Sequence, residues 1–201
     1  GTGQTEMQVQ AMNLLRPKVY AGTPSFLKII IEKAQEMGED ISSLQMALVG
    51  AEALPPSLRQ WLNDHGVPQV LQTYGSADIG NIAYETLSDG KVNPGMVLDE
   101  TLLLEIVRPG TGDPVPEGEV GEIVITSFNH DYPLVRFATG DMSAVLPGVS
   151  PCGRTNTRIK GWMGRADQTT KVRAMFVHPS QVADIVRRHP VVQKARLVIT
   201  G

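Results

Sequence analysis

The chain has 201 residues, of which 41% are hydrophobic and 19% charged, a composition typical of a globular protein with one large domain or one and a half. The formal net charge of −3 gives no indication of a nucleic-acid partner, and no apolar run is long enough to span a membrane. The single cysteine, Cys152, excludes an intrachain disulfide and a multi-cysteine zinc site, and it fits a cytoplasmic protein.

Helix and strand patterns alternate over the first third of the sequence. Apolar spacing predicts helices over 5–15, 23–38 and 55–66, and short apolar runs predict strands over 19–21, 44–49 and 70–73. We expect Thr5 and Ser25 to cap the first two helices, and the first strand to be buried. The alternation predicts an α/β fold with a parallel sheet covered on both faces.

Two glycine-containing segments follow neighbouring strands of this predicted sheet. Gly50, Ala51 and Glu52 come after the second strand, and Tyr74-Gly75-Ser76-Ala77-Asp78 come after the third. Because a parallel sheet binds ligands outside the carboxyl ends of its strands, we expect these two segments to form the floor of a ligand site.

After residue 78 the pattern changes to short strands joined by turns. Strands are predicted over 82–85, 102–107, 119–126, 133–137, 143–146 and 158–163. Turn residues stand at Asp89-Gly90 and over 109–113, and no helix is predicted between residues 86 and 160. We expect a β-meander or a small β-barrel, packed beside the parallel sheet.

The last segment has a β-β-α-β pattern that is too small to fold alone. A hairpin is predicted over 169–173 and 175–177, a helix over 179–188 and a strand over 195–200. We expect this tail to begin a separate α+β domain joined at Asp167. The predicted domains are therefore an α/β part over 1–85, a β-rich part over 86–166 and a truncated small domain over 167–201.

The stretch from Arg136 to Asp141 follows an apolar run over 132–135 and ends in a Gly-Asp turn. We expect the Asp141 carboxylate to be held on a tight bend at the end of a strand. Such a carboxylate has two acceptor oxygens, which can take hydrogen bonds from the two neighbouring hydroxyls of a ribose. The alternative is a surface turn in which Asp141 binds its own backbone.

Six short motifs stand in a fixed order along the chain, over residues 50–52, 74–78, 121–125, 136–141, 164–167 and 171–173. Together they resemble the adenylate-forming superfamily of acyl-CoA synthetases, peptide-synthetase adenylation domains and luciferases. The likeness is closest to the phenylacetate–CoA ligase branch, over residues 133–137, 146–148, 152–154 and 176–182. It implies that a carboxylate attacks the α-phosphate of ATP to give acyl-AMP and pyrophosphate, and that coenzyme A then displaces AMP.

The resemblance implies an adenine site in the N-terminal part. Tyr74 would stack on adenine, with the backbone of Gly50, Ala51 and Glu52 on the other face and with Gly75, Ser76 and Ala77 beside them. Ala77 stands where many relatives have a phosphate-binding hydroxyl. The alternative is that Tyr74 is a core residue at a strand end and that Glu52 is a solvated charge.

A metal role is implied for Asp78, which stands where the family usually has glutamate. It would support Mg²⁺ at the phosphates, since this ion prefers hard oxygen ligands. Aspartate is one methylene shorter than glutamate, so we expect a bridging water rather than direct ligation.

The resemblance also implies a ribose and phosphate site farther along the chain. Asp141 would hold the ribose hydroxyls, and Arg165 would bind the α-phosphate through its planar donor fork. The alternative for Arg165 is a surface salt bridge. Trp162 would lie against the ribose or would simply pack. The second catalytic candidate, Asp167, would be the hinge about which the small domain rotates.

We predict an AMP-forming acid–CoA ligase that uses ATP, Mg²⁺ and coenzyme A on a carboxylic acid, with an aryl acid favoured. The alternatives are an adenylate-forming enzyme with an amine or carrier-protein acceptor, and a non-catalytic nucleotide-binding module. The expected partners are small molecules, with neither nucleic acid nor membrane, and a homodimer is allowed. Lys171 and Arg173 are interpreted as surface charges of a hairpin rather than contacts to coenzyme A phosphates.

The chain opens at Gly1 without an initiator methionine and stops at Gly201, so we expect it to be part of a longer protein. The resemblance implies a phosphate-binding loop rich in Ser, Thr and Gly before residue 1, and a lysine that assists adenylation after residue 201. We therefore expect the chain alone not to turn over, and to keep weak nucleotide affinity through Tyr74, Asp141 and Arg165.

Overall fold

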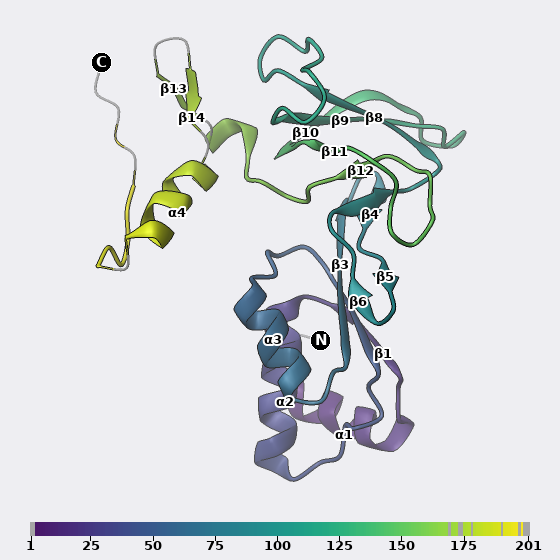
Figure 1. Cartoon of the computed structure of the whole chain (residues 1–201). Coiled ribbons are helices and arrows are strands. Elements are labelled where there is room, and N and C mark those ends of the chain that lie inside the picture. Colours follow the sequence, from purple (N-terminus) through teal and green to yellow (C-terminus); the bar gives the residue numbers. More distant parts are fainter. Residues whose placement is uncertain are drawn as a thin grey trace. The chain divides into compact units, whose positions relative to one another are not determined.

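Two compact units make up the chain (Figure 1). The computed structural model describes residues 3–168, 170–172, 175–177, 179–189, 191–196 and 198. Unit 1 comprises Gly1–Asp99 with Ser150–Thr155, and unit 2 comprises Glu100–Val149 with Asn156–Gly201. The three-part division expected from the sequence stays a prediction.

The predicted helices of unit 1 are confirmed as α1 (Thr5–Leu15), α2 (Pro24–Met37) and α3 (Pro56–Asp64). Both predicted caps are wrong. Gln4 is the N-cap of α1, and Thr23 is the N-cap of α2, because Pro24 takes the first helical position, where its missing N–H costs nothing. Helix α2 ends at Gly38, whose left-handed φ of 69° suits glycine.

The predicted parallel sheet is confirmed in β1 (Val19–Gly22), β2 (Met46–Val49) and β3 (Gln69–Ser76), which pair in parallel. Strand β4 (Gly80–Tyr84) then pairs antiparallel with β3, and β7 (Met96–Leu98) pairs antiparallel with β4. A hairpin of β5 (Leu87–Ser88) and β6 (Lys91–Val92) turns at Asp89-Gly90, where both residues have positive φ. This backbone matches the twist of the two flanking strands.

One face of the parallel sheet carries the core of unit 1. Ala47, Val49 and Val70 point to this face and pack with Leu27, Ile31 and Leu62 of α2 and α3. Alternate residues point to the other face, where Val19 is 56% exposed and Leu48 is 38% exposed. The prediction that residues 19–21 form a buried strand is therefore wrong in its burial, and the predicted cover of both faces is incomplete.

Unit 2 is built on a β-meander, as the sequence predicts. Strands β8 (Leu102–Val107), β9 (Gly121–Ser127) and β10 (Leu134–Ser143) form an antiparallel sheet in the order β10-β9-β8. Strands β11 (Val145–Leu146) and β12 (Arg158–Ile159) pair antiparallel. No helix lies between residues 86 and 160, all of which are described. Buried Ile123, Ile125 and Met142 anchor the sheet.

The tail contains a 3₁₀ turn (Ala166–Gln168), β13 (Thr170–Val172), β14 (Met175–Val177) and α4 (Pro179–Arg188). The predicted hairpin and helix are confirmed, since β13 and β14 pair antiparallel. Of the strand expected over 195–200, residues 195, 196 and 198 are described and do not form a strand. The rest of that range lies outside the described residues, as do Thr169 and Arg173.

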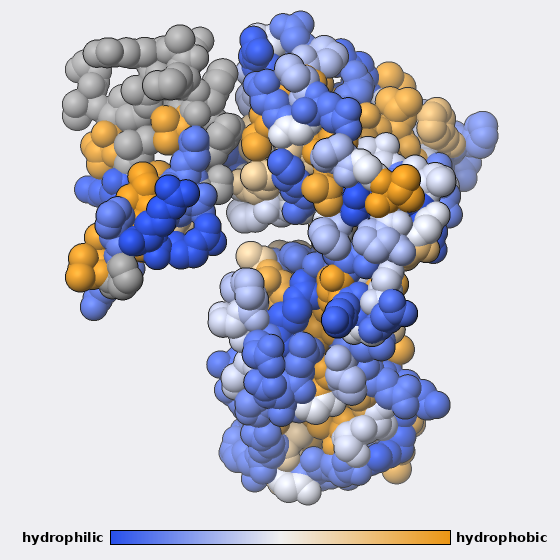
Figure 2. All heavy atoms as spheres, viewed as in Figure 1, coloured by the Kyte–Doolittle hydropathy of each residue, from blue (hydrophilic) through white to orange (hydrophobic). Residues whose placement is uncertain are grey.

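Apolar side chains also stand on the surface, as orange spheres among hydrophilic blue ones show (Figure 2). The exposed large apolar and aromatic side chains of unit 2 include Phe128, Tyr132 and Val135, which are more than half exposed. Within the described part of the chain, no helix combines the length and the apolar character needed to cross a bilayer.

A partly buried ion pair joins α3 to the residue that follows β4. Arg59 donates from Nη1 and Nη2 to the two carboxylate oxygens of Glu85, at 2.8 and 2.7 Å. Glu85 Oε2 also accepts the backbone N–H of Gln72 at 2.7 Å. The Arg59 and Glu85 side chains are 21% and 14% exposed, so solvent screens this pair less than a surface pair.

We predict that Glu85→Gln lowers the free energy of unfolding by about 2 kcal/mol, because Arg59 keeps a half-buried charge without its counter-charge. Glu32→Gln is the matched control, since Glu32 pairs with Lys28 at 3.6 Å on an exposed helix face. Loss of that pair should cost less than about 0.5 kcal/mol. Urea unfolding followed by circular dichroism measures both variants, and equal losses would contradict the role given to Glu85.

Candidate functional site

The predicted site residues fall into two groups. Gly50, Ala51, Glu52 and the segment 74–78 belong to unit 1, whereas Asp141, Trp162, Arg165 and Asp167 belong to unit 2. Lys171 lies in β13, and Arg173 lies outside the described residues.

The backbone after β2 requires a residue without a side chain. A Cβ atom on Gly50 would lie 2.7 Å from Oγ1 and 3.1 Å from the carbonyl oxygen of Thr73, closer than van der Waals contact allows. Ala51 has a φ of 61°, a left-handed conformation that costs energy in a residue other than glycine. Such strain is typical of functional loops, and it supports the choice of this segment from the sequence.

Glu52 ties this segment to the first turn of α2. Its Oε2 accepts the backbone N–H of Ser25 at 3.4 Å, close to the helix N-terminus, where a negative charge is favourable. Burial raises the pKa of Tyr20, and the charge of Glu52 raises it further. Glu52 therefore has local structural contacts in addition to the nucleotide role proposed for it.

Tyr74 lies inside strand β3 rather than after it. The prediction that the segment 74–78 follows the strand is wrong for its first three residues, since β3 continues to Ser76. Gly75 permits this continuation, because a Cβ atom there would lie 2.3 Å from the carbonyl oxygen of Gly80 in the neighbouring strand. Tyr74 is 8% exposed, so stacking on adenine requires its ring to become accessible.

Ala77 and Asp78 occupy the exposed turn between β3 and β4. The turn is held by Ser76, whose Oγ accepts the backbone N–H of Ile79 at 3.2 Å. In the described part of the chain, no three His, Cys, Asp or Glu residues cluster as metal ligands. Mg²⁺ bound by phosphates, water and one carboxylate needs no such cluster, so the metal role of Asp78 stays a prediction.

Asp141 lies within β10, not on a bend at a strand end as the sequence predicted. The strand is irregular there, because Ala138 pairs with Val124 and the next pair is Met142 with Glu122. Residues 139–141 thus face a single residue of β9 and form a bulge, with Gly140 at a φ of 73°. Bulges change the direction of side chains, which is how Asp141 leaves the regular alternation of the strand.

The structure brings Asp141, Trp162 and Arg165 together. Asp141 Oδ1 accepts hydrogen bonds from Trp162 Nε1 at 2.9 Å and from Arg165 Nη1 at 3.2 Å. The backbones of Asp141 and Arg165 form an antiparallel bridge. The Asp141 side chain is 18% exposed and that of Arg165 is 41% exposed, so the pair lies at the surface of unit 2.

Arg165 has further partners besides Asp141. Its Nη1 donates to the carbonyl of Thr139 at 3.2 Å, and its Nε lies 3.5 Å from Oδ1 of Asp167. Partial burial lowers the pKa of Arg165, but the hydrogen bond and charge of Asp141 and the charge of Asp167 outweigh this and raise it. The guanidinium is therefore a permanent cation.

Thr139 is a site residue to which the sequence interpretation gave no role. Its Oγ1 donates to the Ile123 carbonyl at 2.9 Å and accepts the backbone N–H of Asp141 at 3.1 Å. These two hydrogen bonds of Thr139 replace backbone bonds to β9 that the bulge interrupts. Only its place directly before Gly140-Asp141 could have indicated this function.

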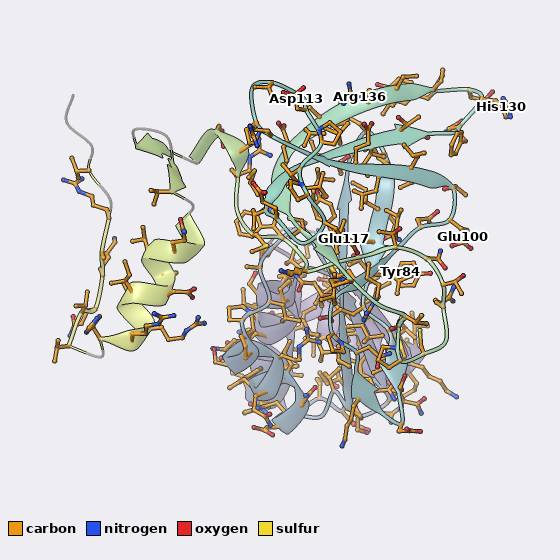
Figure 3. All side chains as sticks on the ribbon, turned by 45° about the horizontal axis from the view of Figure 1, so that its top comes forward. Tyr84, Glu100, Asp113, Glu117, His130 and Arg136 are labelled. Atoms are coloured by element: carbon orange, nitrogen blue, oxygen red, sulfur yellow. The ribbon has the colours of Figure 1, made fainter. Side chains whose placement is uncertain are left out.

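Arg136, labelled in Figure 3, lies at the first register shift of β10, between Leu134 and Phe137. It has a positive φ of 48°, and its Nε donates to Glu105 Oε2 at 3.0 Å. Its Nη2 donates to the carbonyl of Gly112, next to Asp113, at 2.9 Å. Arg136 therefore links β10 to β8 and to the turn over 109–113.

The three-residue group in unit 2 offers a carboxylate acceptor, a guanidinium and an indole N–H in one place. A carboxylate suits hydroxyl donors, and a guanidinium suits anionic oxygens. A molecule with neighbouring hydroxyls and a phosphate matches this arrangement. Its hydroxyls would compete with Trp162 and Arg165 for Asp141.

Cys152 is the one titratable group of unit 1 whose pKa moves into the neutral range among the residues described. Hydrogen bonds from Ser150 and Thr86, then from the Arg154 backbone, lower the pKa of its thiol to about 7. The Arg154 guanidinium stands 5.7 Å from the ring centre of Tyr84, which Figure 3 labels.

The rate of Cys152 alkylation by iodoacetamide is expected to rise with pH through a midpoint near 7. The thiolate is the reactive form, and it accumulates as the pH passes the pKa. Ser150→Ala removes the hydrogen bond that lowers this pKa most and should move the midpoint upward, whereas Ser43→Ala should not. A midpoint at about 8.5, the ordinary thiol value, in the unaltered chain would refute the assignment.

Gly140→Ala is predicted to displace Arg165, because the new Cβ atom would lie 2.5 Å from Arg165 Nη2. Gly118→Ala is the control, since Gly118 has a similar positive φ but open space around it. Both variants should lose about 1 kcal/mol of stability to backbone strain. Only Gly140→Ala should shift the Trp162 indole N–H signal in a ¹⁵N-correlated NMR spectrum; an unshifted signal would contradict the packing described above.

The sequence and the fold both match known proteins. The family model described as AMP-binding enzyme matches residues 2–129. The phenylacetate-coenzyme A ligase of Thermus thermophilus is 30% identical over 192 residues, which cover 94% of this chain and 43% of that enzyme. The Escherichia coli K12 enzyme of the same name is 31% identical, over 90% of this chain and 42% of its own length.

Among solved structures, an open conformation of 2-hydroxyisobutyryl-CoA ligase in complex with 2-HIB-AMP and CoA has the same fold. Its TM-score is 0.81 at 22% identity, and the match covers 94% of this chain and 45% of that one. The chain thus spans less than half the length of these relatives. The resemblance seen in the motifs is confirmed by a family match over more than half of the chain. The chain belongs to the family of AMP-binding enzymes.

Proposed function

We propose that this chain is part of an ATP-dependent ligase that joins a carboxylic acid to coenzyme A through an acyl-AMP. The observation that carries the proposal is the grouping of Asp141, Trp162 and Arg165, which suits a ribose and its phosphate. The names of the Thermus thermophilus and Escherichia coli relatives favour an aryl acid of the phenylacetate type.

In this proposal Asp141 accepts the two ribose hydroxyls, and Trp162 lies against the sugar. Arg165 binds the α-phosphate and stabilises the charge that develops there when the acid carboxylate attacks. Attack forms the bond between carboxylate oxygen and phosphorus and breaks the bond to pyrophosphate. The thiol of coenzyme A then bonds to the acyl carbon, and AMP leaves.

In unit 1, two segments carry the residues to which the proposal gives an adenine or a metal role. Tyr74 would stack on adenine once its ring is accessible, with the strained backbone of Gly50 and Ala51 on the other face. Gly75, Ser76 and Ala77 would line the same segment. Asp78, exposed on its turn, suits a water-bridged Mg²⁺, which would neutralise phosphate charge.

The hinge role of Asp167 belongs to the proposal as well. Asp167 lies in the 3₁₀ turn that precedes the tail, and its carboxylate meets Arg165 at 3.5 Å. Rotation of the backbone at Asp167 would break its contact with Arg165 when the tail changes conformation. We further propose a cytoplasmic protein with small-molecule partners, and a homodimer is compatible with the proposal.

The test uses a polypeptide of the relatives' length that contains this chain, with ATP, phenylacetate and coenzyme A. Pyrophosphate and the acyl-CoA are the expected products. Arg165→Ala should lower kcat about 100-fold or more, because it removes charge stabilisation of the transition state. Asp141→Asn should mainly raise KM for ATP, about tenfold, since one ribose acceptor is weakened.

Glu105→Gln is the control, because Glu105 pairs with Arg136 on the same sheet and has no place in the proposed site. ATP binding without pyrophosphate release for any acid would replace the proposal with a non-catalytic nucleotide-binding module. An amide formed from an added amine, with no acyl-CoA, would reassign the acceptor.

A further inference from the structure

The bulge in β10 interrupts its pairing with β9. Residues 139–141 face only Ile123 of β9, so the N–H groups of Gly140 and Asp141 cannot both be paired by the ladder. Asp141 N–H is taken by Thr139 Oγ1. Gly140 N–H is taken by the side chain of Glu122, whose Oε1 accepts it at 3.1 Å.

The geometry of the Asp141–Arg165 ion pair depends on the position of the Gly140 backbone. The Arg165 guanidinium lies so close that a Cβ atom on Gly140 would be 2.5 Å from Nη2 and 2.9 Å from Cζ. On one side of Gly140, the Thr139 carbonyl accepts from Arg165; on the other, Asp141 accepts from Arg165 and Trp162. Any movement of the Gly140 peptide therefore moves both partners of the ion pair.

We infer that Glu122 is a positioning residue, whose carboxylate holds the Gly140 peptide and so places Asp141 and Arg165 for the nucleotide. Glu122 is itself well placed for this, since it pairs with Met142 in the ladder directly beyond the bulge. It acts through Gly140 and does not touch the nucleotide. The nucleotide part of the inference rests on the proposed function.

The test compares Glu122→Met and Glu122→Gln in the 201-residue chain. Both side chains have nearly the length of glutamate, but only glutamine keeps an oxygen acceptor for the Gly140 N–H. Glu105→Met is the control, because it removes another carboxylate of this sheet, one that binds Arg136 instead of the bulge. The chain has two tryptophans, so ¹⁵N-correlated spectra contain two indole N–H signals to assign.

Without nucleotide, Glu122→Met is expected to shift the Trp162 indole signal, because the Asp141 carboxylate that accepts this N–H moves with the bulge. The Trp61 signal should stay, and so should both signals in Glu122→Gln and Glu105→Met. With AMP, Glu122→Met should weaken binding about tenfold, and the other two variants less than about twofold. The AMP affinities are followed in the same spectra.

An unshifted Trp162 signal in Glu122→Met would overturn the inference, and so would a shift as large in Glu122→Gln. If the unaltered chain does not respond to AMP, the nucleotide role of this chain fails, while the indole signals still decide the positioning role. If Glu122→Met does not fold, the hydrogen-exchange rate of the Gly140 amide in the unaltered chain tests the inference instead. A Gly140 amide that exchanges as fast as those of exposed turns would then refute the hydrogen bond to Glu122.

Discussion

The hydrogen-bonded ion pair between Asp141 and Arg165 is the interaction on which the site in unit 2 depends. By itself such a pair is weak, about 1 kcal/mol or less, because its members are 18% and 41% exposed and water screens them. Its geometry must therefore come from the backbone. The bridge between the two residues, and hydrogen bonds from Met142 and Met163 across it, hold the two segments in register.

A nucleotide that binds unit 2 would meet a carboxylate, that of Asp141, which already accepts hydrogen bonds within the protein. Asp141 Oδ1 already accepts from Trp162 and Arg165, so ribose hydroxyls would share this carboxylate with the two existing donors. Where a hydroxyl displaces one of these donors, the gain is only a difference between two similar hydrogen bonds. The benefit lies in preorganisation, since the acceptor and the cation are in place before the ligand arrives.

In unit 1, three residues of the proposed adenine site have an unusual backbone environment. Gly50 and Gly75 stand where another strand leaves no room for a Cβ atom, and Ala51, directly after Gly50, has a left-handed backbone. The sequence interpretation chose these residues for a nucleotide role, which stays a proposal. It placed the end of β3 too early, because Tyr74, Gly75 and Ser76 continue the strand through pairing with β4. That pairing makes β3 and β4 a hairpin with its turn at residues 77–79.

Local periodicity was sufficient to predict α1–α4, the parallel sheet and the meander, since helices and strands repeat their apolar residues with different periods. The motifs by themselves also determined the family. Only the tertiary structure decided how Asp141 is held, because the carboxylate and its partners are far apart in sequence: Glu122 lies 18 residues before Gly140, and Trp162 lies 21 residues after Asp141. A bulge arises when two strands fail to match in length, and this mismatch belongs to the pair of strands rather than to either sequence alone.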